Sequence, residues 1–232
     1  MGFKELLPTV GKALWETLYM TVGSTLMAYI LGLPLGVLLA VTADDGLLPN
    51  RPVNRVLGTV VNLLRSVPFI ILLVWVMPLT RAIVGTTIGS TATLVPLVIA
   101  SAPFLARMVE SSLREVDRGV IEAAQAMGAS PMQIITRVML VEAKPSLITG
   151  AAIALATILG YSAMSGIVGG GGLGTIAINY GYYRGNSEVM LLMVALLVLI
   201  VEIFQDAGSR VAMMCDRRLR NGKNKTRSRK KA

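Results

Sequence analysis

Histidine is absent from this chain of 232 residues, and cysteine occurs only once, at Cys215. Without histidine the chain cannot form a histidine-based catalytic triad, an HExxH zinc site or a histidine proton relay. With a single cysteine it cannot form an internal disulfide. We therefore expect no catalytic residue and no metal site, and we do not expect an enzyme.

Charged residues are also scarce, at 15% of the chain against 54% hydrophobic residues, and the mean hydropathy is +0.68. This composition is too apolar for an ordinary soluble domain. A membrane span needs roughly 20 apolar residues, and spans are expected to be helical because backbone groups must be hydrogen-bonded internally in lipid. The sequence therefore predicts an all-α membrane protein with five spans, at about residues 15–43, 56–79, 91–106, 146–166 and 188–205.

Few charges fall within these spans. Arg65 lies near the start of the predicted second span, where a long side chain can extend to the lipid headgroups. No Asp, Glu or Lys lies near the middle of a span, and this weakens the case for an ion-coupled carrier.

The distribution of Lys and Arg predicts the orientation. Eighteen of the 22 basic residues fall on one side of the spans, and only Lys4, Lys12, Arg81 and Arg184 fall on the other. The richer side is expected to be cytoplasmic, which places the N-terminus outside and the C-terminus inside. The tail at 221–232 is predicted to be disordered, and its charges suit anionic lipid, at about 1 kcal/mol per basic residue, better than nucleic acid.

The segment between the third and fourth spans, residues 107–145, predicts two short helices joined by a sharp turn in the cytoplasm. Asp117 can cap the first helix, and Gly128 lies where a left-handed C-terminal cap is required. Ser130 begins the second helix, followed by Pro131, with Gln133 completing a capping box. From pattern alone, a solvated connector between spans is an equal alternative. The apolar face of the first helix consists of Val120, Ala123, Ala124 and Met127.

A glycine-rich segment, Gly166–Gly174, follows the fourth span. A phosphate-binding P-loop would require Lys and then Ser or Thr after its last glycine, whereas this segment ends Leu173-Gly174-Thr175. We expect a flexible or tightly turned external loop instead. The aromatic cluster after it fits either an interfacial belt or a docking surface for an external protein. The docking candidates are Gly171, Gly172, Tyr180, Tyr182 and Arg184.

The fourth span itself carries small and polar residues. Such residues either face a water-filled route or allow close helix packing. The candidates for a translocation pathway are Tyr161, Ser162, Met164 and Ser165.

Glu122-Ala123-Ala124, followed three residues later by Gly128, resembles the cytoplasmic EAA loop of ABC importer permeases. The segments at 65–75, 102–110 and 160–164, the glycine-rich loop and the patch at 180–182 together resemble the methionine-importer branch of that family. The resemblance runs from about Trp15 to Arg210. One departure is visible: Leu140 is followed by Val141, where the family commonly has Leu-Pro. Pro145 is an alternative helix break, so the end of the loop is left open.

The resemblance implies a type I ABC importer permease with five spans in the bacterial inner membrane. It also implies a homodimer of permeases, two cytoplasmic ATPase subunits that bind ATP and Mg²⁺, and an external methionine-binding protein. This chain would bind lipids but no cofactor and no nucleic acid. The implied substrate is methionine, as the L-isomer, with the D-isomer left open. The residues implied to contact the ATPase are Glu122, Ala123, Ala124, Met127, Gly128, Ser130 and Pro131.

Two other functions stay open from the sequence. A related permease could carry another amino acid or small solute, because specificity can reside in the binding protein. A self-sufficient channel or ion-coupled secondary carrier is the alternative of another class.

Overall fold

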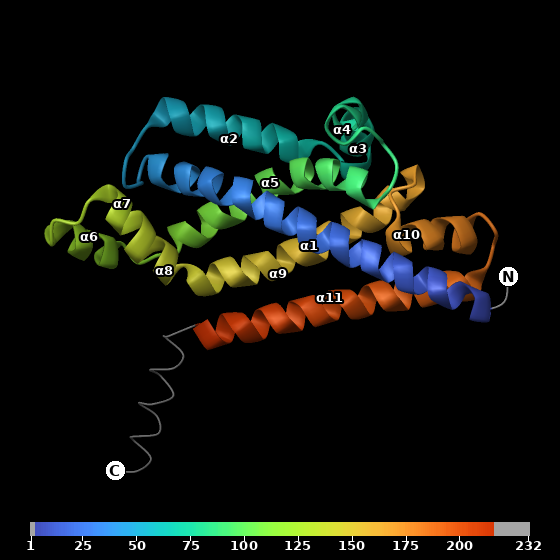
Figure 1. Ribbon diagram of the computed structural model, residues 1–232. Coiled ribbons are helices and arrows are strands. Elements are labelled where there is room, and N and C mark those ends of the chain that lie inside the picture. Colours follow the sequence, from blue (N-terminus) through green and yellow to red (C-terminus); the bar gives the residue numbers. More distant parts are fainter. Residues whose placement is uncertain (1–2, 216–232) are drawn as a thin grey trace, which may run out of the picture.

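Four long apolar helices form the body of the computed structural model, which describes residues 3–215, with side chains from Pro8 onward (Figure 1). Each is long and apolar enough to cross a membrane, and the number of spans is four, or five if a bent pair, α2 (Arg51–Ser66) with α3 (Phe69–Trp75), crosses as one span. The described residues contain no strand. The prediction of an all-helical membrane protein is confirmed, while the tail at 221–232 lies outside the described residues. The four helices are α1 (Phe3–Thr42), α5 (Ser90–Arg114), α9 (Lys144–Met164) and α11 (Ser187–Cys215).

The predicted second span, residues 56–79, is not one continuous helix. The axes of α2 and α3 differ by 100°, and α4 (Met77–Val84) follows after a further break. Val67 has an extended backbone, with φ −77° and ψ 123°, because the ring of Pro68 disfavours the helical conformation in the residue before it. The expected position of Arg65 is also wrong, because Arg65 lies at the end of α2 and not near the start of a span.

The other helices extend beyond the predicted spans. Helix α1 begins before residue 15, α5 continues past Ala106 to Arg114, and α11 continues past Gln205 to Cys215. Apolar runs mark only the part of a helix that suits lipid, whereas the backbone hydrogen bonds continue into polar sequence.

Helices α1 and α5 approach each other closely at two glycines. A Cβ atom on Gly32 would lie 2.9 Å from the carbonyl oxygen of Ala102, and one on Gly36 would lie 2.5 Å from that of Ala106. Small residues four apart allow such contact between membrane helices. The two helices therefore form a closely packed pair.

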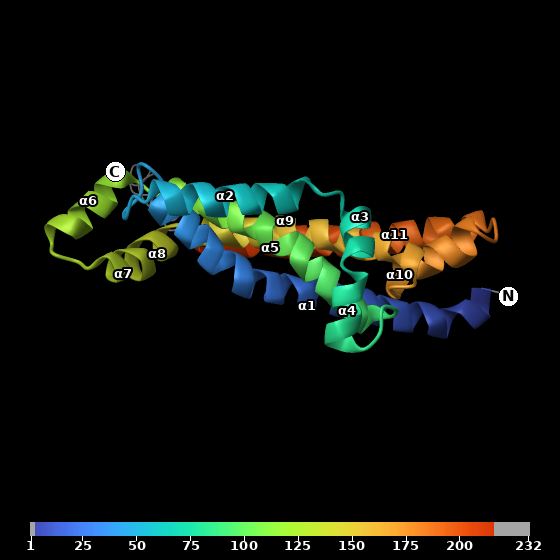
Figure 2. The same ribbon diagram turned by 90° about the horizontal axis from the view of Figure 1, so that it is seen from above.

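Short elements occupy the two ends of the bundle (Figures 1 and 2). At one end lie α6 (Arg118–Ala126), α7 (Pro131–Gln133), the π-helix η1 (Ile134–Met139) and α8 (Leu140–Glu142), which we call the hairpin. Toward the other end lie the 3₁₀ helix η2 (Ser165–Val168), α10 (Gly172–Ile176) and the π-helix η3 (Ala177–Tyr182), which we call the glycine-rich end.

Candidate functional site

The first helix of the hairpin is capped at both ends, as predicted. A side-chain oxygen of Asp117 accepts a hydrogen bond from the N–H of Gly119 at 2.7 Å. At the other end, the N–H of Ala129 bonds to the carbonyl of Ala124 at 3.1 Å, and that of Gly128 bonds to the carbonyl of Gln125 at 2.9 Å. This pair of bonds defines a Schellman motif, which requires a left-handed residue, and Gly128 supplies it with φ +79°.

The second helix of the hairpin begins with the predicted capping box. The N–H of Gln133 donates to Ser130 Oγ at 3.4 Å, the N–H of Ser130 donates to Gln133 Oε1 at 2.8 Å, and Pro131 is the first helical residue. The hairpin then ends at Ala143, and Pro145 lies in the first turn of α9. The sequence left open where the loop ends, because Val141 replaces the family's proline. In the structure the helix breaks at Ala143, just before Pro145. The π-helical turns of η1 were not predicted.

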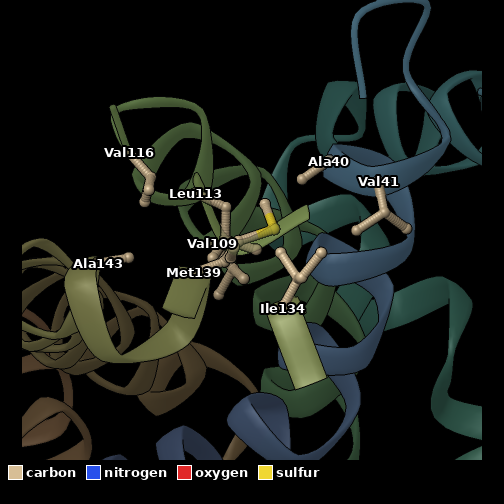
Figure 3. Close-up of a cluster of buried hydrophobic side chains, with 9 residues drawn as sticks. Ala40, Val41, Val109, Leu113, Val116, Ile134, Met139 and Ala143 are labelled. Carbon is tan, nitrogen blue, oxygen red and sulfur yellow. The ribbon is translucent and has the colours of Figure 1, made fainter. Parts of the chain in front are cut away.

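A cluster of buried apolar side chains fixes the hairpin to the ends of α1 and α5 (Figure 3). Ile134 and Met139 from η1 are 1% and 5% exposed and pack against Val109 and Leu113 of α5. Close-packed interiors transmit displacement, so the hairpin and these helix ends are expected to move together. The buried members are Ala40, Val41, Val109, Leu113, Val116, Ala124, Ile134, Met139 and Ala143.

The predicted apolar face of the first helix is mostly exposed. Only Ala124 is buried against the cluster, whereas Ala123 is exposed, Val120 is 41% exposed and Met127 is 81% exposed. An exposed apolar surface on a segment outside the apolar spans is a candidate interaction site. Sequence reasoning missed Met132, which is 68% exposed in the first turn of α7. Its position directly after the predicted helix start could have identified it.

Polar contacts around the hairpin divide into free and paired groups. Glu122 is exposed and has no hydrogen bond or ion pair within the described part of the chain, so its carboxylate is available to a partner. In contrast, Arg118 forms an ion pair with Asp45 in the loop between α1 and α2, with 2.5 Å between Nη2 and Oδ2. This contact joins residues 73 positions apart and was not predicted.

The four pathway candidates lie at the end of α9 and the start of η2. Ser162 and Ser165 are buried, and their hydroxyls donate to the carbonyls of Leu159 at 2.8 Å and of Ser162 at 2.6 Å. Tyr161 stacks on Phe69 of α3, with ring centroids 4.6 Å apart. Met164 alone is half exposed. Three of the four side chains therefore contact neighbouring residues of the same chain, and their assignment to a pathway stays a prediction.

The five docking candidates separate into two groups. The N–H of Gly172 donates to Glu16 Oε2 of α1 at 2.8 Å, and both Gly171 and Gly172 adopt positive φ, at +88° and +72°. This segment is tightly turned against α1. Tyr182 is 69% exposed, and the guanidinium of Arg184 lies 4.3 Å from the ring centre of Tyr180. Only the aromatic group therefore offers an accessible surface.

Close packing at the glycine-rich end predicts that adding one methyl group at Gly174 lowers the stability of the protein. A Cβ on Gly174 would lie 2.6 Å from Cα of Ala163, so Gly174→Ala is expected to lower the free energy of unfolding by about 1–3 kcal/mol. Thermal unfolding in detergent measures this loss. Gly160→Ala is the matched control, because nothing lies within 4 Å of its Cβ position in α9 and helical Ala is favoured over Gly. Equal midpoints for the two variants would contradict the prediction.

A buried ion-pair network that sequence reasoning missed joins α2 to α5. The carboxylate of Glu110, with 9% of its side chain exposed, contacts Arg107 Nη1 at 2.6 Å and Arg114 Nη2 at 3.5 Å. Nη2 of Arg107 donates to the carbonyl of Gly58 and to Oδ1 of Asn62, at 3.1 and 3.0 Å. The spacing of three and four residues in one helix is the signal that could have identified the two ion pairs.

Fold and hairpin together define a multi-pass membrane protein with a capped helical hairpin, partly exposed, at one end. The family model of the binding-protein-dependent transport system inner membrane component matches residues 32–210. The chain belongs to this family, and its location is the inner membrane.

Relatives and solved structures agree with this assignment. The chain is 50% identical over 206 residues to the probable D-methionine transport system permease protein MetI of Vibrio cholerae serotype O1, covering 89% of this chain and 92% of that protein. It is 52% identical over 155 residues to the D-methionine transport system permease protein MetI of Escherichia coli K12, covering 67% and 71%. A chain of the inward-facing MetNI methionine ABC transporter structure superposes with a TM-score of 0.90 at 48% identity, covering 94% of this chain and all of that one. An amino acid ABC transporter, at 19% identity and a TM-score of 0.70, shares the fold.

Proposed function

We propose that this chain is the permease subunit of an ABC importer that carries methionine, the L-isomer and also the D-isomer, across the bacterial inner membrane. The hairpin carries the proposal, because it is packed rigidly on α1 and α5 while Met127 and Glu122 are left exposed and without a partner in the described chain. The substrate is inferred from relatives about 50% identical whose names specify D-methionine and from the methionine transporter with a matching chain.

The proposed assembly contains two copies of this permease, two ATPase subunits and an external methionine-binding protein. ATP and Mg²⁺ would bind to the ATPase, and this chain would bind no cofactor. The hairpin would face the cytoplasm, where an ATPase can reach it, and the start of α1 would lie outside. The excess of Lys and Arg on the hairpin side supports this orientation. Tyr182 and Arg184, exposed at the opposite end, would contact the binding protein.

The proposed mechanism couples ATP binding to movement of the spans. Closure of the two ATPases would displace the hairpin, and the buried cluster around Ile134 would pass this displacement to α1 and α5. The route would then alternate between inward- and outward-facing states. Such a population shift requires the ATPase to bind the two states with different affinity.

Reconstitution tests the proposed function. Permease, ATPase and binding protein in proteoliposomes should accumulate labelled methionine only when ATP is present on the hairpin side. Transport by the permease alone, without an ATPase, would show a self-sufficient carrier or channel. Efficient competition by an unrelated amino acid would show that another substrate is carried.

Met127→Ala is expected to weaken assembly with the ATPase. The few side chains that fill a central pocket of a partner contribute about 2 kcal/mol, and we expect Met127 to be one of them, with a loss of affinity of roughly 10- to 100-fold. Co-purification of the ATPase at graded concentrations measures this loss. Met214→Ala in α11 is the control, since that residue is also exposed, at 72%, but lies outside the hairpin. If both variants retain the ATPase equally, the hairpin does not bind it through Met127.

A further inference from the structure

Helix α2 exposes two faces of different chemistry. At 100° per residue, its exposed polar residues occupy one sector, about a third of the helix circumference. An adjacent sector is exposed and apolar, whereas Gly58 and Val61 are buried and Val61 packs with Leu39 of α1 and Ala106 of α5. The polar face consists of Arg51, Arg55, Thr59, Asn62, Arg65 and Ser66, and the apolar face of Val53, Val56, Val60 and Leu63.

The polar face reaches the middle of the bundle. The side chain of Asn54 donates to the carbonyl of Leu39 near the end of α1, so α2 begins at the hairpin side. Further along, Gly58 contacts Arg107 of α5, and Phe69, just after α2, packs with Leu97 of α5. Arg65 falls between these two levels, beside the middle of α5 and about 20 Å along the helix axis from its start. Figure 2 shows α2 ending beside the central part of the bundle.

Arg65 has no compensating group in the described part of the chain. It is exposed and forms neither an ion pair nor a hydrogen bond there. Charged side chains at such depth face a water-filled cavity or another protein segment, because lipid cannot solvate them. Two acids near this face are already paired: Asp44 with Arg51 at the start of α2, and the buried Glu110 with Arg107 and Arg114. Beyond Arg51, the polar face of α2 therefore presents positive charge to whatever lies outside this chain, either water or another protein segment.

We propose that this polar face lines the aqueous route between the two permease copies, and that Arg65 contacts the carboxylate of the transported amino acid. The inference rests on the proposed function and assigns the route to residues other than the four candidates on α9 and η2. A guanidinium binds a carboxylate through two parallel hydrogen bonds. Arg65 would therefore recognise the carboxylate that all amino acids share and would not distinguish one amino-acid side chain from another.

Cysteine labelling tests the hydrated face without reference to a substrate. Cys215→Ser removes the single native cysteine, and cysteines are then introduced singly in the complete transporter. Thiosulfonate reagents react with thiolates in water, so polar-face cysteines at Thr59, Asn62 and Ser66 should react at least about tenfold faster than apolar-face cysteines at Val56, Val60 and Leu63. Equal rates on the two faces, or no reaction on the polar face, would overturn the proposed lining.

Transport by Arg65 variants tests the ligand role. With saturating loaded binding protein, Arg65→Gln should lower methionine uptake about tenfold while stimulated ATP hydrolysis stays within about twofold of wild type, and Arg65→Lys should restore part of the uptake. Arg81→Gln is the control, because Arg81 is also exposed and unpaired in the described residues but lies on α4. A purely structural role would lower uptake and hydrolysis together, and that result would overturn the inference.

Three further outcomes show which part of the proposal is wrong. Glu202 on α11 is exposed, so a charge exchange, Arg65→Glu with Glu202→Arg, that restores uptake would show an ion pair between copies and overturn the ligand role. If wild-type transporter imports no methionine, the proposed function fails. If wild type imports methionine and Arg65→Gln does so at the same rate, only the present inference fails.

Discussion

Gly128→Val is expected to uncouple ATP hydrolysis from methionine uptake. Gly128 has φ +79°, and a β-branched side chain in that conformation costs about 1–3 kcal/mol. The strain would break the Schellman bonds to Ala124 and Gln125 and shift α6 relative to the buried cluster. We expect uptake to fall more than about tenfold, since the docking face would be misaligned with the ATPase. Uptake and hydrolysis measured together in proteoliposomes give the ratio that reports coupling.

Gly85→Val provides a matched control for the backbone strain. Gly85 caps α4 with φ +82°, and, as at Gly128, nothing lies within 4 Å of its Cβ position. The two substitutions therefore introduce the same strain at different ends of the molecule. Gly85→Val should lower stability similarly but leave the number of molecules transported per ATP unchanged. If Gly128→Val imports methionine at the wild-type rate, the hairpin does not transmit the movement.

The hairpin could be predicted from sequence because its geometry depends on near neighbours. Asp117 and Ser130 cap helices through backbone groups two or three residues away, and the left-handed turn is decided by one glycine. Exposure was harder to predict. The apolar pattern from Val120 to Met127 resembles a core-facing stripe, yet only Ala124 is covered by the chain itself. A helix face that binds a partner protein and a helix face that packs within its own chain have the same spacing of apolar residues.

The break at Pro68 could not be predicted from the presence of proline. Pro96 and Pro103 lie inside α5, which continues through both, whereas α2 ends just before Pro68. In a membrane protein, neighbouring helices and side chains can satisfy the backbone groups that a proline frees. Whether a proline ends a helix therefore depends on packing that is distant in sequence. The ion pair of Arg118 with Asp45 could not be predicted for the same reason, because the two residues are distant in sequence.

Glu110→Ala is expected to have the largest effect on stability. Removing one partner of a buried ion pair commonly costs about 3–5 kcal/mol, because the other charge stays buried without compensation. Arg107 keeps 26% of its side chain exposed, so solvent reduces the expected loss to about 2–3 kcal/mol, or roughly 5–10 °C in the thermal midpoint. Thermal unfolding in detergent measures this shift.

Asp206→Ala is the control for Glu110→Ala. Asp206 pairs with Arg210 at 2.7 Å, four residues apart in one helix, as Glu110 is from Arg114. The side chains of Asp206 and Arg210 are both more than half exposed. Exposed pairs contribute about 1 kcal/mol or less, so the thermal midpoint of Asp206→Ala should fall by no more than about 3 °C.

Replacing Arg107 and Glu110 together by methionine should recover part of the stability lost in Glu110→Ala, since no unpaired charge is left. Equal shifts for the two alanine variants would show that burial does not decide the contribution of Glu110. Because Arg107 also bonds to Gly58 and Asn62, the Glu110 variant should loosen α2 from α5 and lower uptake as well.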